Sequence, residues 1–329
     1  MRAGLECVAA DVRRRIRAWE ITGMIRLVTS AATRSLGVGF CFAASLALVS
    51  VWPARGDTHP PTQQVQGVCR FILHGYPLTQ SDADKINFVV ADLVKRQSAA
   101  FGFAADINLQ IRIRMFGRAA DYYQFASTNH GGTGGESSGT GITNLAGYYS
   151  PGHNEVVTWR QKDPSYLANN LLHECSHAIS HSQYRVLPIW LNEGGAVYFS
   201  FPLLLRDASD TRQLNSRWAR MKKYLDEGSL PDIARFVNLD PKEFRALPQD
   251  QAYVVSWSLF QLLMSKPENR KAMSEMMQRL QKSGTSPADC ATLLDELYPG
   301  GVAKMERDWR EWISRGAANV LPARPAATR

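Results

Sequence analysis

The feature that most constrains this chain is the five-residue motif His173-Glu174-x-x-His177. Residues four apart on a helix lie on one face, so both imidazoles can reach a single metal ion. Glu174 points elsewhere around the helix and can act on water without being a ligand. The motif is flanked at helical spacing by apolar residues, namely Leu167, Leu171, Leu172, Cys175, Ala178 and Ile179. Buried histidines are costly unless they bond something, so we expect a metal site; the alternative is a pair of hydrogen-bonded core histidines.

A catalytic zinc site needs a third protein ligand and one open position. Glu193 is the first candidate, because fifteen residues lie between it and His177. That spacing allows the motif helix to end, the chain to turn near residues 185–188, and a second helix to return antiparallel to the first. Gly194 and Gly195 follow the ligand and permit close packing of this second helix. One ion held by His173, His177 and Glu193 is therefore predicted.

Two other histidines compete for the third position. His181 lies on the motif helix, two turns after His173, where it cannot easily share one ion with the first two ligands. His153 precedes the helix and is expected to line the cleft. The His-x-x-Gly-x-x-His extension that would continue some zinc motifs is absent, since Ser180 and Gln183 occupy those places.

The N-terminal 55 residues carry most of the net charge of +8, because they contain eight arginines and three acidic residues. The rest of the chain has 30 basic and 27 acidic residues, which is typical of a solvated surface, so we expect no nucleic-acid partner. Residues 35–54 carry no charge and follow Arg26 and Arg34. This pattern predicts a secretory signal peptide or an uncleaved membrane anchor; a buried core helix is the alternative.

The N-terminal pattern predicts a periplasmic or secreted protein, or one attached to the membrane through residues 35–54. Met24 offers an alternative start, in which case residues 1–23 would not be translated. Residues 56–66 are polar and contain prolines, which indicates a linker. A tail with many Pro, Ala and Arg residues over 317–329 is expected to be disordered.

The body, residues 67–316, has a mixed front part over 67–162 and a helical rear part over 163–316. Alternating or β-prone residues predict strands at 108–115, 148–149 and 155–159. The Gly-rich stretch 131–141 lacks a phosphate-loop pattern, so we expect a surface loop. Helical periodicity predicts helices at 82–99, 119–126, 164–181, 189–200, 214–226, 249–265, 269–282, 287–297 and 302–315.

Three cysteines remain beyond the N-terminal segment: Cys69, Cys175 and Cys290. Cys69 and Cys290 either pair in an oxidising compartment or stay as two buried thiols, and the sequence leaves both options open. Cys175 lies two residues before His177 on another face of the helix, so we expect it to pack rather than to bind metal.

Together, His173-Glu-x-x-His177 and Trp190-Leu-Asn-Glu-Gly194 resemble the gluzincin clan of zinc peptidases. The second string looks like the matching segment of membrane-alanyl-type aminopeptidases, while the chain's size and exported N-terminus are more similar to small bacterial peptidase-MA-like proteins. The resemblance is tight over residues 166–200. It implies an α+β, thermolysin-like catalytic fold over 67–316, with a small mixed sheet, an active-site helix and a helical C-terminal subdomain.

The resemblance also implies roles: His173, His177 and Glu193 as ligands of one zinc ion, and Glu174 as the base. Two family features are absent. No Gly-Ala-Met-Glu-Asn motif is present to hold a substrate amino terminus, and Val197 stands where thermolysin-type sites have an aspartate. The catalytic tyrosine of the aminopeptidases corresponds by spacing to Tyr253, as an oxyanion donor; the alternative is a core aromatic.

The function implied is that of an exported zinc peptidase, in which Glu174 activates a zinc-bound water to hydrolyse peptide bonds. Its partner would be a peptide or protein substrate. Two alternatives stay open. One is a non-catalytic interaction protein on the same fold, against which the intact Glu174 counts. The other is a zinc hydrolase of non-peptide amides or esters, because the water chemistry is shared.

Overall fold

A computed structural model describes residues 61–103, 109–129, 146–184, 186–200, 208–283 and 289–316. Within these ranges, no helix is both long enough and apolar enough to cross a membrane. The segments expected to be an export signal or anchor, a Gly-rich loop at 131–141 and a C-terminal tail lie outside the described residues.

Within the described residues, five strands form one mixed sheet in the order β1-β2-β3-β5-β4. The strands are β1 (Thr62–Gln66), β2 (Cys69–His74), β3 (Ile111–Phe116), β4 (Gly147–Ser150) and β5 (Glu155–Trp159). The three central strands β2, β3 and β5 are parallel, whereas β1 and β4 run antiparallel to their neighbours. Strand β4 is therefore at one edge of the sheet.

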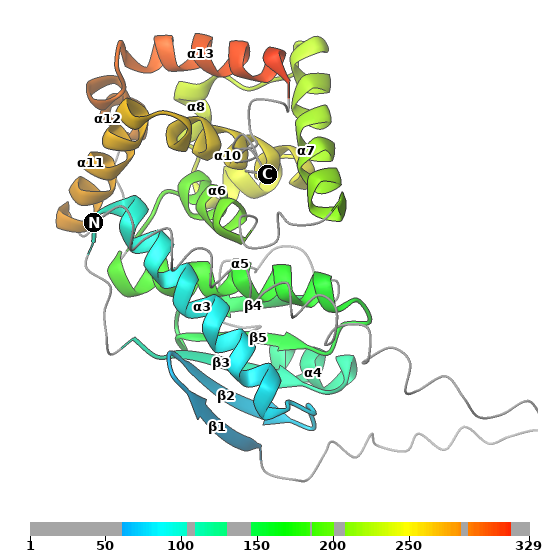
Figure 1. Cartoon of the computed structure of the whole chain (residues 1–329). Coiled ribbons are helices and arrows are strands. Elements are labelled where there is room, and N and C mark those ends of the chain that lie inside the picture. The colour runs from blue at the N-terminus through cyan, green and yellow to red at the C-terminus, as the bar shows by residue number, and fades with distance from the viewer. Residues whose placement is uncertain are drawn as a thin grey trace, which may run out of the picture. The chain divides into compact units, whose positions relative to one another are not determined.

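Helices make up most of the described chain after β5, as Figure 1 shows. The helices are α3 (Gln80–Phe101), α4 (Ala119–Asn129), α5 (Pro164–Gln183), α6 (Ile189–Ser200), α7 (Ala208–Asp226), α8 (Ile233–Val237), α9 (Pro241–Ala246), α10 (Gln249–Ser265), α11 (Pro267–Ser283), α12 (Cys290–Leu297) and α13 (Gly301–Arg315). Helix α5 contacts β4 and β5 on one side and α6 on the other. It thus lies between the sheet and the later helices (Figure 1).

The two faces of the sheet have different covers, because side chains alternate along a strand. On β3, Ile111, Ile113 and Met115 are buried in the main core with α3 and α5. On the other face, Phe116 joins Tyr122 of α4 in a second, smaller cluster. The α+β class and the mixed sheet expected from the sequence are confirmed by this arrangement.

Two strands were not expected at the front of the domain. Residues 62–66 form β1, so the linker expected over 56–66 is wrong at its C-terminal end. Residues 69–74 form β2, which pairs with β1 and β3 and has no counterpart among the expected strands. The polar β1 is held by backbone pairing rather than by apolar side chains, which explains why its sequence looks like a linker.

The expected helices are present, two of them with the same bounds: α6 and α10. The short helices α8 and α9 were not expected. Cys69, Cys175 and Cys290 are free, buried thiols, so the open question of a Cys69–Cys290 bond is answered in favour of unpaired cysteines.

Candidate metal centre

Helix α5 presents the His-Glu-x-x-His motif from a deeply packed position. It begins at Pro164 directly after Asp163, and proline is well suited to the first turn of a helix. Of the six apolar residues expected to form a buried stripe, Leu167 is only partly buried. The other five are buried: Leu171, Leu172, Cys175, Ala178 and Ile179. With these residues held in the core, the opposite face directs His173 and His177 toward α6.

Helix α6 returns beside α5 and brings the third ligand. Backbone hydrogen bonds from Leu191 and Asn192 to the Pro188 carbonyl start this helix. Its glycines allow close packing against α10, because a Cβ on Gly194 would lie 2.5 Å from the Ser256 carbonyl oxygen. Glu193 is consequently buried at 6% exposure, at the point where α6 faces the motif helix.

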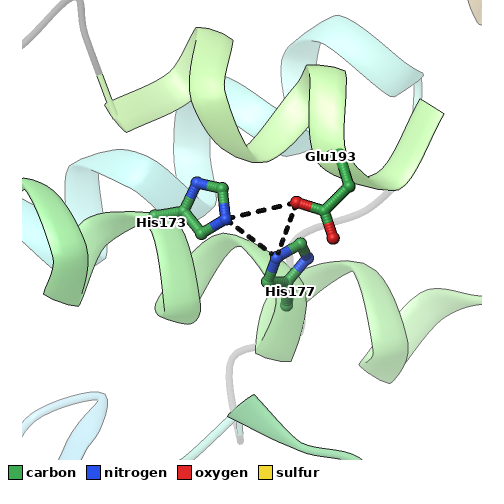
Figure 2. A group of neighbouring side chains, drawn as sticks. All are labelled: His173, His177 and Glu193. Atoms are coloured by element: carbon green, nitrogen blue, oxygen red, sulfur yellow. Dashed lines mark hydrogen bonds and ion pairs between the residues drawn. The ribbon is translucent and has the colours of Figure 1, made fainter. Parts of the chain in front are cut away.

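The three predicted ligands meet, as Figure 2 shows. The His173 and His177 Nε2 atoms are 3.2 Å apart, and Glu193 Oε2 lies 3.4 Å from the first and 3.7 Å from the second. Ligands of a tetrahedral zinc ion at about 2.0–2.1 Å stand about 3.3 Å from one another. Two imidazole nitrogens and one carboxylate oxygen are also a donor set that zinc accepts, and these residues therefore fit one zinc ion.

The Glu193 carboxylate has the charge and the exposure of a metal ligand. Its Oε2 atom is buried and has no hydrogen-bond partner among the described residues. Burial raises the pKa of Glu193, but His177, His173 and Arg245 outweigh that effect and hold the pKa below its ordinary value. A buried, ionised oxygen without a hydrogen bond is expected where a cation binds.

A neighbouring amide orients one of the histidines. His177 Nδ1 lies 3.1 Å from Asn192 Oδ1, so Nδ1 carries the proton and donates it to the amide oxygen. In the neutral imidazole, Nε2 is then the unprotonated nitrogen, as a metal ligand must be. Val197 stands where thermolysin-type sites have an aspartate, and it cannot hydrogen-bond a histidine. Asn192 orients His177 instead, which the sequence analysis did not predict.

Glu174 follows His173 on α5 and is not part of the ligand group. It is 8% exposed, and its Oε1 accepts a hydrogen bond of 3.4 Å from Asn170 Nδ2. The sequence reasoning missed Asn170 as well, although it precedes Glu174 by four residues and so shares its helix face.

The other predicted candidates lie in different surroundings. Tyr253 is partly buried in α10 and packs on the main core, with its ring 6.0 Å from that of Phe244. Its role as oxyanion donor stays a prediction. The two competing histidines are outside the ligand group, since His181 packs against Tyr149 and His153 contacts Ser150.

Comparisons with known proteins complete the description. No protein-family model matches the sequence, and no curated protein does. Among solved structures, the chain is similar to an M1 zinc metallopeptidase mutant from Deinococcus radiodurans bound to a Tyr-Ser-Ala substrate, with 14% identity and a TM-score of 0.44. That similarity covers 80% of this chain and 53% of the other.

Two further structures are similar at the same level. One is yeast LTA4 hydrolase in complex with bestatin, with 16% identity and a TM-score of 0.44 over 80% of this chain and 40% of that one. The other is an aminopeptidase N family protein from Idiomarina loihiensis, with 14% identity and a TM-score of 0.43 over 76% and 46%. This chain therefore spans about half the length of these proteins or less.

Proposed function

We propose that this chain is an exported, zinc-dependent peptidase of the gluzincin type, related to the bacterial peptidase-MA-like group. The observation that carries the proposal is the meeting of His173, His177 and Glu193 at the mutual distances that one tetrahedral zinc ion requires. Glu174, the residue after His173 on the motif helix, is a buried carboxylate outside this ligand group. A purely structural zinc site has no need of such a base, which favours catalysis.

The chain supplies the groups that hydrolysis needs. Zinc, when bound, supplies Lewis acidity, which polarises a carbonyl and allows water to lose a proton near neutral pH. Glu174 takes one proton from the attacking water as the water oxygen bonds to the carbonyl carbon. It then passes that proton to the nitrogen as the carbon–nitrogen bond breaks, so the carboxylate is restored. Tyr253 is proposed as the donor to the developing oxyanion.

Strand β4 is the proposed place for the substrate backbone. The sequence left two candidates, residues 147–150 and residues 155–159. Strand β5 is paired on both sides, with β3 and β4, whereas β4 is at the end of the strand order. An extended peptide can add to a sheet only at an edge, which favours β4.

Export is part of the proposal on sequence grounds alone. An uncharged stretch over residues 35–54 follows a basic flank, as in signal peptides and short anchors. Fractionation of expressing bacteria, with N-terminal sequencing of the product, tests it. Recovery of the intact chain in the cytoplasmic fraction would contradict export. It would leave the proposed zinc site unaffected.

The full chain serves to test the zinc peptidase proposal. Zinc content and cleavage of a mixed peptide library are compared for the wild type and Glu174→Gln. We expect about one zinc per chain in both proteins, and cleavage only in the wild type. His177→Gln should lose zinc, whereas the matched change His181→Gln, one turn further along α5, should keep it.

Each outcome bears on a different reading. Zinc without turnover in the wild type would refute peptidase activity and favour a binding role. Cleavage of simple amides or esters, but of no peptide, would instead favour a zinc hydrolase of non-peptide amides or esters. If wild-type protein binds no zinc, or if His181→Gln loses zinc as His177→Gln does, the ligand assignment is wrong.

A further inference from the structure

The hydrogen bond between Asn170 and Glu174 is a feature that the three ligands do not explain. Both residues lie on α5, four positions apart, so their side chains share one face of the helix. Asn170 Nδ2 is 3.4 Å from Glu174 Oε1 and donates to it. One oxygen of the carboxylate is thereby occupied, which leaves Oε2 to exchange protons.

The other end of the Asn170 amide, its Oδ1 atom, packs closely against the sheet. A Cβ on Gly147, the first residue of β4, would lie 2.4 Å from Asn170 Oδ1 and 2.8 Å from the Val157 carbonyl oxygen. Gly147 does not have a positive φ, so the glycine is needed here for space rather than for its backbone conformation. The strand backbone therefore lies directly against the amide.

Asn170 Oδ1 is buried and accepts no hydrogen bond among the described residues. A buried amide oxygen without a partner is unfavourable, so the favourable hydrogen bond of this side chain is the one at its other end. That other end is the Nδ2 group, which contacts the carboxylate proposed as the base. A general base has to be held within hydrogen-bond reach of its proton, and a flexible Glu side chain needs support to stay there.

We propose that Asn170 is a positioning residue for Glu174 and that Gly147 makes room for it at the edge of the sheet. This inference rests on the proposed function, because it assigns a role within that site. It also connects strand β4, on which the substrate backbone is proposed to lie, with the base through a single side chain. A change in β4 at Gly147 is then transmitted to Glu174.

The kinetic test uses the zinc-loaded full chain and a fluorogenic peptide chosen from the library cleavage. Asn170→Asp keeps the shape of the side chain but removes its donor, and Asn170→Ala removes the amide without adding charge. We expect kcat to fall about 10- to 100-fold in both variants, with KM and zinc affinity within about twofold of wild type. Asn169→Asp makes the same chemical change at the next position of α5 and should keep the wild-type kcat.

A second measurement does not need activity or zinc. In the zinc-free full chain, the side-chain amide signal of Asn170 is assigned by NMR from its loss in Asn170→Asp. Glu174→Ala should move this signal upfield and speed its hydrogen exchange at least about tenfold, because the acceptor is gone. The Asn169 amide signal should not change.

The outcomes separate this inference from the proposed function. If the wild type cleaves peptides and both Asn170 variants keep its kcat, positioning by Asn170 is refuted while the peptidase stands. If the wild type cleaves no peptide, the NMR measurement decides. An Asn170 amide signal whose shift and exchange rate do not change in Glu174→Ala would overturn the inference. If Asn170→Asp does not fold, Asn170→Ala decides the kinetic arm. An equal loss of kcat in Asn169→Asp would also refute positioning by Asn170, because any such change in α5 would then lower kcat.

Discussion

Replacing Gly194 by alanine should separate α6 from α10 and weaken the metal centre. The added methyl carbon would lie 2.5 Å from the Ser256 carbonyl oxygen, whereas close carbon–oxygen contacts are usually about 3.3–3.6 Å. That oxygen belongs to the backbone of α10 and cannot rotate away as a side chain does. The two helices must therefore move apart by about 0.8 Å.

The size of the effect follows from two opposing terms. Overpacking of this kind costs up to about 3 kcal/mol. Alanine regains about 1 kcal/mol because it favours the helix more than glycine does. The net loss in the free energy of unfolding is about 2 kcal/mol, which lowers Tm by about 4–8 °C in a domain of this size.

Metal affinity should fall as well, because Glu193 precedes Gly194 and moves with it. A shift of about 0.8 Å exceeds the tolerance of about 0.2 Å for metal–ligand distances, so the zinc Kd should rise at least about tenfold. Urea unfolding of the zinc-free full chain and competition with a chelator measure the two effects.

Gly195→Ala is the matched control on the same helix. Its Cβ would lie 3.1 Å from Phe260 Cε2, so the contact is with a side chain, which has to shift by only a few tenths of an ångström, rather than with the backbone of α10. We expect a stability near that of wild type, or higher by up to about 1 kcal/mol, and an unchanged zinc Kd. If both alanine variants behave alike, the close approach of Gly194 to α10 does not hold the third ligand in place.

Three further predictions concern residues around the site and the sheet. Asn192→Ala should raise the zinc Kd about 10- to 100-fold by chelator competition, while Asn192→Asp, which keeps the acceptor, should not; equal affinities would refute the orienting role. Burial and Arg114 lower the pKa of His74 below 6.5, so the folded state binds its proton less readily than the unfolded state and stability is lost as pH falls below about 6.5. His74→Gln should therefore show a shallower loss of stability from pH 7 to 5 in urea unfolding, and an identical slope would contradict this. Gln97→Leu removes the buried hydrogen bond from Gln97 to Ser180 between α3 and α5. It should lower the free energy of unfolding by about 1–3 kcal/mol and leave the zinc affinity unchanged. An unchanged free energy of unfolding would show that this hydrogen bond does not stabilise the fold.

Local patterns were sufficient to predict the helices that carry the ligands. The apolar stripe of α5 and the turn before Ile189 lie within one stretch of chain, and their periodicity does not depend on distant partners. The positions of Gly194 and Gly195 also predicted close helix packing, which the contacts with α10 confirm.

Features that depend on distant residues were not predictable in this way. Strand β2 forms beside β3, about forty residues later, and β1 pairs with the backbone of β2. The short helices α8 and α9 depend on their N-caps, and the capping box at Asp240 and Glu243 was a signal that went unused. The contact of Asn170 with Gly147 depends on how α5 lies on the sheet, and no spacing in the sequence encodes that.

The buried Glu193 oxygen that faces the two histidines has a consequence for how the chain responds to its surroundings. A cation that binds Glu193 and the two histidines only in the folded chain stabilises the fold by mass action. At a free zinc concentration 100 times the Kd, the gain is about 2.7 kcal/mol. The fraction of folded chains, and with it the lifetime of the protein in the presence of proteases, would then follow the zinc supply.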